Sequence, residues 1–129
     1  MNEEQRKVFT PVKARIESQI IPVYLTAWFR YFIAYNPHPT LEKVKIPVLA
    51  INGKNDLQAS AKENLNLIAA ALKGGENRDY TIKSFPKLNH LFQTSQTGMV
   101  TEYGEIEETI APVVLETISN WILKRARRK

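Results

Sequence analysis

The sequence predicts an α/β fold built on a parallel βαβ unit with flanking helices. Residues 45–53, KIPVLAING, form a short apolar run closed by Asn-Gly, which is typical of a strand buried on both faces of a parallel sheet. Residues 60–75, SAKENLNLIAAALKGG, have the pattern of a capped amphipathic helix. Residues 79–86, DYTIKSFP, alternate weakly and are rich in strand-forming side chains. Strand, helix and strand in this order predict a right-handed crossover.

The N-terminal third is predicted to form two helices separated by Pro22. Thr10 is expected to cap the first, with Pro11 at its first helical position, where the missing N–H costs nothing. Apolar side chains then recur every four residues, at Val12, Ile16 and Ile20.

The second of these helices, residues 23–35, is dense in aromatic side chains. They fall nearly all round the helix, at Tyr24, Trp28, Phe29, Tyr31, Phe32 and Tyr35. Such a helix is either buried on several sides or packs against something outside this chain. The segment NPHPT ends it, because residues before proline avoid the helical region.

The remaining helices have clear boundaries and apolar faces. Ser60 and Glu63 form a capping box, and Gly74 is the expected C′ residue of the helix between the strands. Its apolar stripe consists of Leu65, Ile68 and Leu72. A final helix over residues 111–127 is predicted to bury Val114, Ile118, Trp121 and Ile122. Between the second strand and this helix lies a long polar stretch of the kind that often has a function.

Composition excludes several classes of protein. A chain of 129 residues suits one domain, and a hydrophobic share of 43% suits a globular one. The absence of cysteine excludes disulfides, thiolate metal sites and thiol catalysis, and we expect neither a metal nor a cofactor. No apolar stretch is long enough to span a membrane, and the polar first ten residues do not resemble a secretory signal. We therefore expect a soluble chain. The sequence does not specify the compartment in which it is found.

The net charge of +5 is concentrated in the last six residues, KRARRK. Cations at a helix C-terminus complement the helix dipole and keep an exposed end solvated. The alternative is a polyanionic partner, since basic runs can bind polyanions. The zinc-finger, RNP-like and basic-plus-heptad patterns of nucleic-acid-binding proteins are missing, so no nucleic-acid partner is expected.

Two chemically competent residues follow the two predicted strands. Asp56 comes just after the first strand and His90 just after the second. Parallel neighbours bring these loops to one edge of the sheet, where ligands of open α/β sheets bind. The carboxylate would then hold one imidazole nitrogen and leave the other as a base. Taken separately, Asp56 has a simple alternative as a turn residue, and His90 as a surface residue.

A nucleophile is harder to find. None of the five glycines brackets a serine in the G-x-S-x-G pattern of a nucleophile elbow. Ser60 is explained as a helix cap, Ser84 lies in the second strand, and Ser95 follows His90, which breaks the order serine, acid, histidine. The other histidine, His38, lies in a turn between two prolines and is expected to be structural.

Three segments resemble the C-terminal part of an α/β-hydrolase, and more narrowly the bacterial branch of serine aminopeptidases and acyl esterases. They are KIPVLAINGKNDLQASAKENLNLI, FPKLNHLFQTSQTG and EYGEIEETIAPVVLETISNWILK, and the resemblance runs from about Trp28 to Lys124. It implies that Asp56 is the acid and His90 the base of a catalytic triad. It also implies that residues 1–25 derive from a lid and that residues 26–129 hold the last two strands and the final helix of one partial domain. The earlier strands, the oxyanion-hole loop and the nucleophile elbow of the family have no counterpart here.

The resemblance therefore implies a portion of a serine hydrolase that cleaves a small acyl ester or peptide by acyl transfer. The chain alone is expected to be inactive, because it lacks the nucleophile. The alternative is a non-catalytic α/β module that binds a partner chain through its aromatic helix. Because two parallel strands alone are a poor core, we also expect an exposed strand edge through which the chain associates with itself.

Overall fold

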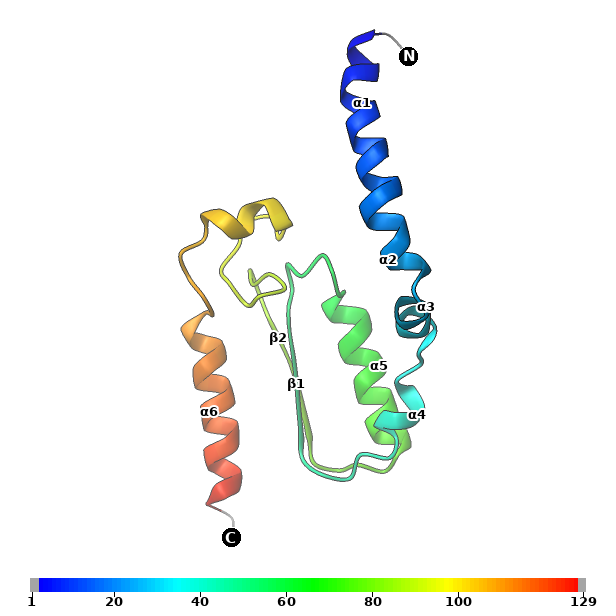
Figure 1. Cartoon of the computed structure of the whole chain (residues 1–129). Coiled ribbons are helices and arrows are strands. Elements are labelled where there is room, and N and C mark those ends of the chain that lie inside the picture. Colours follow the sequence, from blue (N-terminus) through cyan, green and yellow to red (C-terminus); the bar gives the residue numbers. More distant parts are fainter. Residues whose placement is uncertain (1–2, 128–129) are drawn as a thin grey trace. The chain divides into compact units, whose positions relative to one another are not determined.

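The structure is a computed structural model that describes residues 3–127. Its helices and strands follow the order α1 (Glu3–Arg15), η1 (Ile16–Ile20), α2 (Ile21–Leu25), α3 (Ala27–Ala34), α4 (His38–Leu41), β1 (Val48–Gly53), α5 (Ala61–Gly74), β2 (Tyr80–Phe85), η2 (Val100–Glu105) and α6 (Pro112–Ala126) (Figure 1). The chain divides into two compact units, the first ending at Asn36 and the second beginning at Pro37. The first unit thus includes α3, which the prediction assigned to the core.

The first unit is helical from Glu3 to Leu25. Pro11 lies inside α1, so the prediction that a helix begins there is wrong; the residues before it, EEQRKVF, include good helix formers. Pro22 does not interrupt the helical path either. A wider π-helical turn, η1, directly precedes α2, which has this proline in its first turn. The break comes instead at Thr26, which is extended and whose hydroxyl oxygen accepts a hydrogen bond from the N–H of Phe29.

The aromatic side chains of this unit contact each other. Trp28 stacks on Phe32 with ring centroids 5.5 Å apart, and Tyr24 meets Phe29 edge to face at 4.3 Å. Most of these rings are nevertheless exposed, including Trp28, Tyr31 and Phe32 at more than half of their surface. The aromatic helix is therefore not buried within the first unit.

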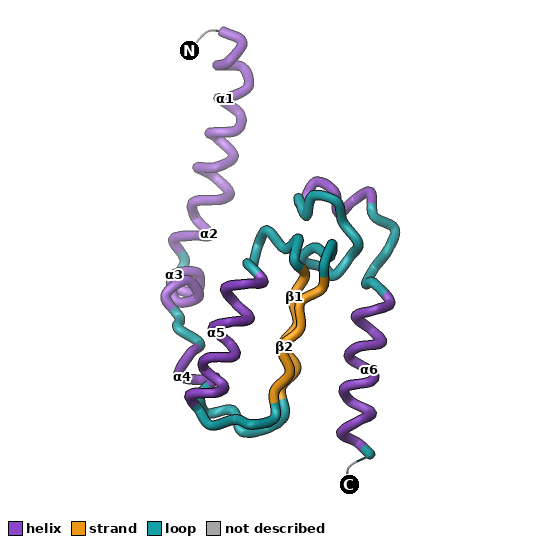
Figure 2. Tube along the Cα trace, turned by 180° about the vertical axis from the view of Figure 1, so that it is seen from behind, coloured by secondary structure: helices purple, strands orange, loops and turns teal. Residues whose placement is uncertain are grey.

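The second unit contains the predicted parallel βαβ unit. β1 and β2 pair in parallel, with Val48 opposite Tyr80 and Gly53 opposite Phe85. The strands lie between α5 and α6 (Figure 2). Toward α6 the core consists of Phe85, Leu88, Ala111 and Val114, against which Ile51, Phe92 and Ile118 pack. The fold is thus of mixed α/β type, with a sheet of two parallel strands among the described residues.

α5 begins as predicted and ends later than predicted. The hydroxyl of Ser60 accepts a hydrogen bond from the N–H of Glu63, as a cap should. The helix ends in a Schellman motif, in which Glu76 donates to Lys73 and Asn77 donates to Leu72. The C′ residue is therefore Glu76, with φ of 60°, and the prediction of Gly74 is wrong.

Gly75, the residue before Glu76, contacts a distant part of the chain. A Cβ atom there would be 1.9 Å from the carbonyl oxygen of Glu42, which follows α4. Glycine at this position therefore allows close packing of α4 on α5, and the left-handed residue falls one place further on.

α6 packs on the sheet through the predicted stripe, with one exception. Val114 is buried and Ile118 packs on the core, and the indole N–H of Trp121 donates to the hydroxyl of Thr81 in β2. Ile122, predicted as buried, is 52% exposed, because the sheet formed by residues 3–127 has two strands and no third one beneath that side of the helix. Arg125 stacks on Trp121 and forms an ion pair with Asp79, so one cation of KRARRK is engaged in the fold. Residues 128–129 of that run lie outside the described residues.

Candidate active site

Asp56 and His90 are brought together as their positions after two parallel strands predict. β1 ends three residues before Asp56, and β2 ends five residues before His90. Nδ1 of His90 lies 2.9 Å from Oδ2 of Asp56, which is a hydrogen-bonding distance. The two residues are 34 positions apart in the sequence, so it is the parallel pairing of the strands that places them in contact.

The two oxygens of Asp56 have different partners. Oδ1 accepts hydrogen bonds from the backbone N–H groups of Gln58 and Ala59, both at 2.9 Å, while Oδ2 faces His90. The sequence left two roles open for Asp56, that of a turn residue and that of the residue that orients the histidine. Its carboxylate has both roles. The two backbone bonds fix the carboxylate plane and hence the position of Oδ2.

Hydrogen bonding makes Asp56 an effective acceptor. Burial alone would raise its pKa, but the hydrogen bonds from His90, Ala59 and Gln58 outweigh that effect and the pKa lies below its ordinary value. The carboxylate is therefore ionised at neutral pH. An ionised acceptor requires that Nδ1 of His90 bear the proton, which leaves Nε2 of the neutral ring with a free lone pair.

His90 is accessible from solvent on the side away from Asp56. Its side chain is 43% exposed, whereas that of Asp56 is 4% exposed. Within residues 3–127 no side chain forms a hydrogen bond with Nε2 of His90. An oriented imidazole with an open Nε2 can accept a proton from a group that approaches it.

Asn89, next to His90, anchors the histidine loop from below. Its side chain is fully buried. The side-chain oxygen Oδ1 accepts hydrogen bonds from the N–H groups of Leu91 and Gln93 at 2.9 and 3.0 Å. Its amide donates to the side-chain oxygen of Gln93 at 2.9 Å. Every side-chain bond of Asn89 thus closes the tight loop around His90. Sequence reasoning missed this role, because an isolated asparagine before a histidine has no distinctive pattern.

The two site loops are joined by backbone contacts. The N–H of Lys54 donates to Phe85 at 2.8 Å, and that of Asn55 donates to Leu88 at 2.9 Å. A Cβ atom at Gly53 would lie 2.2 Å from the carbonyl oxygen of Leu88, so only glycine allows this approach. The loop of Asp56 and the loop of His90 are therefore held against each other.

The long segment after His90 braces the site. The carboxylate of Glu102 in η2 accepts hydrogen bonds from the N–H groups of Gln96, Thr97 and Gly98, and these bonds lower its pKa. Gly98, with φ of +77°, then lies against the carbonyl of Asn55. The predicted functional loop is therefore ordered by its own hydrogen bonds, and it contacts the loop of Asp56.

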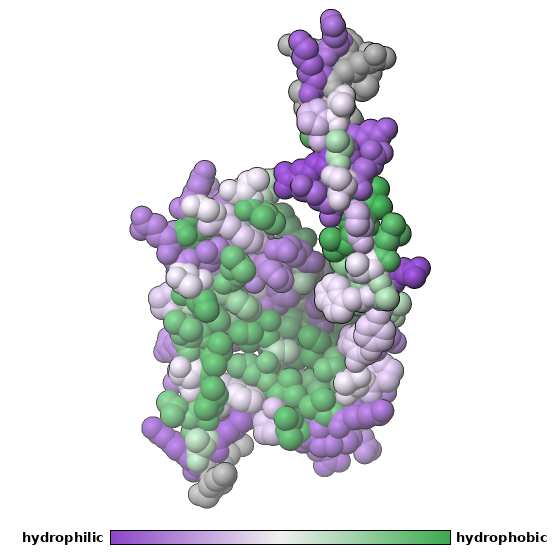
Figure 3. Space-filling view, in the orientation of Figure 1, coloured by the Kyte–Doolittle hydropathy of each residue, from purple (hydrophilic) through white to green (hydrophobic). Residues whose placement is uncertain are grey.

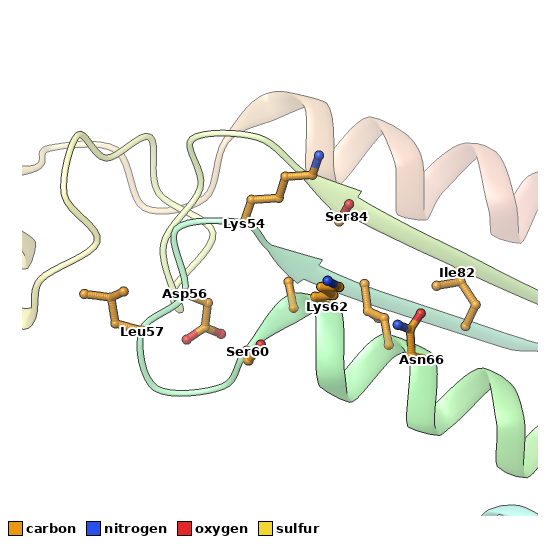
Figure 4. Close-up of a pocket in the computed structure, with 10 residues that line it drawn as sticks. Lys54, Asp56, Leu57, Ser60, Lys62, Asn66, Ile82 and Ser84 are labelled. Atoms are coloured by element: carbon orange, nitrogen blue, oxygen red, sulfur yellow. The ribbon is translucent and has the colours of Figure 1, made fainter.

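No serine forms a hydrogen bond with His90 among residues 3–127. Ser60 caps α5, and Ser95 is buried with its hydroxyl facing the amide of Asn55. Ser84 lies in β2 and lines a cavity beside Asp56 (Figure 4). The structure thus leaves the predicted pair of acid and base without a nucleophile among its described residues.

The cavity beside Asp56 has a volume of about 760 Å³. Its walls come from the start of α5, the loop after β1, and β2, and include Lys54, Lys62 and Asn66 (Figure 4). His90 is not among its lining residues.

Other candidate sites are not supported by the described residues. Residues 3–127 contain no cluster of three or more His, Cys, Asp or Glu side chains that could hold a metal ion. None of their helices combines the length and the apolar character that a membrane crossing requires. His38 lies 3.6 Å from the carboxylate of Glu42, one helical turn away.

No protein-family model matches the chain, and comparison with curated proteins and with solved structures found no match.

Proposed function

We propose that Asp56 and His90 are the acid and the base of a serine-hydrolase active site of the α/β-hydrolase type. The observation that carries this proposal is the 2.9 Å hydrogen bond between Nδ1 of His90 and Oδ2 of Asp56. Its support is the order of the elements: an acid after one strand and a histidine after the parallel neighbour, with Nε2 exposed. The nucleophilic serine and the oxyanion donors come from polypeptide outside these residues.

The proposed chemistry is acyl transfer from a small ester or peptide. The serine hydroxyl approaches Nε2 of His90, which takes its proton as the oxygen attacks the acyl carbon. The imidazolium then gives this proton to the leaving alcohol or amine, and a water molecule repeats the sequence to release the acid. Asp56 keeps Nδ1 protonated throughout and stabilises the charged ring, with its own position fixed by Gln58 and Ala59.

To test this proposal, the chain is given an affinity tag and isolated together with the polypeptides that bind to it. A fluorophosphonate, which reacts with activated serines, should label one serine on the associated polypeptide, and His90→Gln or Asp56→Asn should greatly reduce labelling. The purified 129-residue chain should show neither labelling nor ester turnover. Labelling that is indifferent to His90, or turnover by the isolated chain that His90→Ala abolishes, would contradict the proposed arrangement.

A second candidate is a non-catalytic module that binds a partner through the aromatic helix. The observation in its favour is the exposure of Trp28, Tyr31 and Phe32, at 67%, 66% and 61%. This function predicts that Asp56→Asn and His90→Ala leave the assembled protein fully functional, while Trp28→Ala impairs it. A third candidate function is the binding of a polyanion by KRARRK. This function requires that the affinity for the polyanion fall steeply as the salt concentration rises.

A further inference from the structure

The cavity beside Asp56 has both cationic and apolar side chains in its lining. In Figure 3 the surface over α6 and over the strands beside it is mainly hydrophobic. The cavity differs, because Lys54 and Lys62 line it together with Leu65 and Ile82. Its volume of about 760 Å³ lies within the range of about 300–1,000 Å³ that is usual for small-molecule pockets. The cavity is therefore large enough for a small organic ligand.

The β2 wall of the cavity follows from the alternation of side chains along the strand. Lys83 faces α6, where its ammonium group donates to the hydroxyl of Thr117 at 2.8 Å. Its neighbours Ile82 and Ser84 therefore face α5 on the other side of the sheet. They line the cavity with one apolar side chain and one hydroxyl group.

The α5 wall follows from helical spacing. Lys62 and Asn66 are four residues apart, so they lie on one face of α5, with Leu65 next to them. Figure 4 shows Lys62 and Asn66 on the side of α5 toward the strands, and Lys54 extending from the loop after β1 toward Ser84. Lysines from two separate segments thus border the same cavity.

The polar side chains of the cavity are available to a ligand. Four of them have no hydrogen-bond or ion-pair partner among residues 3–127: Lys54, Lys62, Asn66 and Ser84. Among the described lining residues Asp56 is the one anionic side chain, and both of its oxygens are engaged by His90 and by backbone N–H groups. Two cations against one anion give the lining a net charge of +1.

We propose that this cavity binds a small organic carboxylate, whose charged end meets the two lysines and whose apolar chain lies against Leu65 and Ile82. The amide of Asn66 and the hydroxyl of Ser84 can donate hydrogen bonds to the carboxylate oxygens. A singly charged group suits the net charge of the lining, whereas a doubly charged phosphate is repelled more strongly by Asp56. The inference goes beyond the proposed function, because it requires neither the base nor a nucleophile.

Titration of the ¹⁵N-labelled full chain with sodium hexanoate tests this site. We expect saturable shifts of the amide signals of Lys54, Lys62 and Ser84, with a dissociation constant on the order of 1 mM, as a ligand of this size can reach. Hexan-1-ol lacks the charge and inorganic phosphate lacks the apolar chain, so each should bind at least about tenfold more weakly. Shifts that do not saturate, or an equal affinity for either comparison compound, overturn the proposal.

Substitution of the two lysines separates the cavity from the remaining positive charge of the chain. Lys54→Gln combined with Lys62→Gln should reduce the affinity for hexanoate by at least about tenfold, because each substitution removes a charge-assisted hydrogen bond. The control combines Lys73→Gln with Lys124→Gln, two exposed residues that do not line the cavity. It removes the same charge and should change the affinity by less than about twofold. Equal losses in the two variants overturn the proposed site.

Substitution of an exposed leucine tests the apolar part of the cavity. Leu57 lines the cavity and is 65% exposed, so Leu57→Ser should leave the fold intact and lower the affinity for hexanoate by about threefold. Leu67→Ser is the control, because Leu67 is 61% exposed on α5 and does not line the cavity. Circular dichroism establishes that both variants fold. Equal affinities of the two variants contradict an apolar contact in this cavity.

Discussion

Gly53 lies directly against the carbonyl oxygen of Leu88, where a Cβ atom would approach to 2.2 Å. This contact joins the end of β1 to the loop of His90 and sets the distance between the two site loops. Glycine at the end of β1 is therefore a requirement of the site as well as of the strand. A substitution of Gly53 tests how far the Asp56–His90 hydrogen bond depends on the packing of the two loops.

Gly53→Ala should therefore displace the histidine loop. We expect a loss of about 1–3 kcal/mol in the free energy of unfolding, typical of overpacking against backbone that cannot move aside. Urea unfolding measures this loss, and the ¹⁵N chemical shifts of His90 report whether Nδ1 remains bonded. Gly104→Ala is the control, since a Cβ atom there meets nothing within 4 Å. An equal effect of the two substitutions would contradict the role assigned to Gly53.

Asp56→Asn should remove a pH-dependent contribution to stability. The pKa of folded Asp56 is lowered, so the unfolded chain binds a proton at higher pH than the folded chain does. The stabilisation is therefore complete above the ordinary pKa of aspartate, and it is lost as the pH falls through the lowered value. The difference in unfolding free energy between wild type and variant should accordingly be largest near neutral pH and shrink in acid.

Urea unfolding of both proteins at a series of pH values measures that difference. The same variant should shift the tautomer equilibrium of His90, visible in its ¹⁵N spectrum, while His38 serves as an internal reference. A difference in stability that stays constant down to strongly acidic pH would show that Asp56 is not the titrating partner.

Asn89→Ala should destabilise the protein more than an exposed asparagine would. The substitution leaves the N–H group of Leu91 and the buried N–H group of Gln93 without their acceptor, at a cost of about 1–3 kcal/mol. Asn64→Ala is the comparison, because Asn64 is exposed and its side chain makes a single bond to Ser60. Amide hydrogen exchange should show the loss of protection confined to the histidine loop. Similar stabilities of the two variants would argue against Asn89 as its anchor.

The isolated chain should associate with itself through the edge of β1. Ile122 is half exposed on the border of α6 beside this edge, and Leu123 is equally exposed on another side of the helix. Sedimentation velocity should detect association that increases with concentration and that Ile122→Lys weakens, while Leu123→Lys leaves it nearly unchanged. A chain that stays monomeric at every concentration would contradict the expectation that it associates through this edge.

Local patterns sufficed to predict the βαβ unit. The Ser60 cap, the apolar run ending at Gly53 and the strand-forming residues of β2 each act through near neighbours, and the structure has them as expected. The Asp56–His90 contact followed from topology alone, because parallel strands end at one edge of a sheet.

Other features depend on contacts between distant residues, which local patterns do not specify. Gly74 was expected to end α5, but the left-handed position is Glu76, and Gly75 is needed for the close approach of Glu42. Ile122 was expected to be buried, since its spacing matches the core stripe, and only the extent of the sheet decides otherwise. The roles of Asn89 and Glu102 likewise arise from loop conformation, for which neither residue has a sequence signature.

The parallel register of the sheet also sets the order of events during folding. Parallel pairing closes a long stretch of chain, including the whole of α5, before the paired backbone begins to compensate for the lost entropy. Asp56 and His90 each lie beyond the end of one strand, so their hydrogen bond can form only once this closure has occurred. The hydrogen bond between Nδ1 of His90 and Oδ2 of Asp56 is therefore a late marker of folding: nascent or misregistered chains have both side chains but not the acid–base pair.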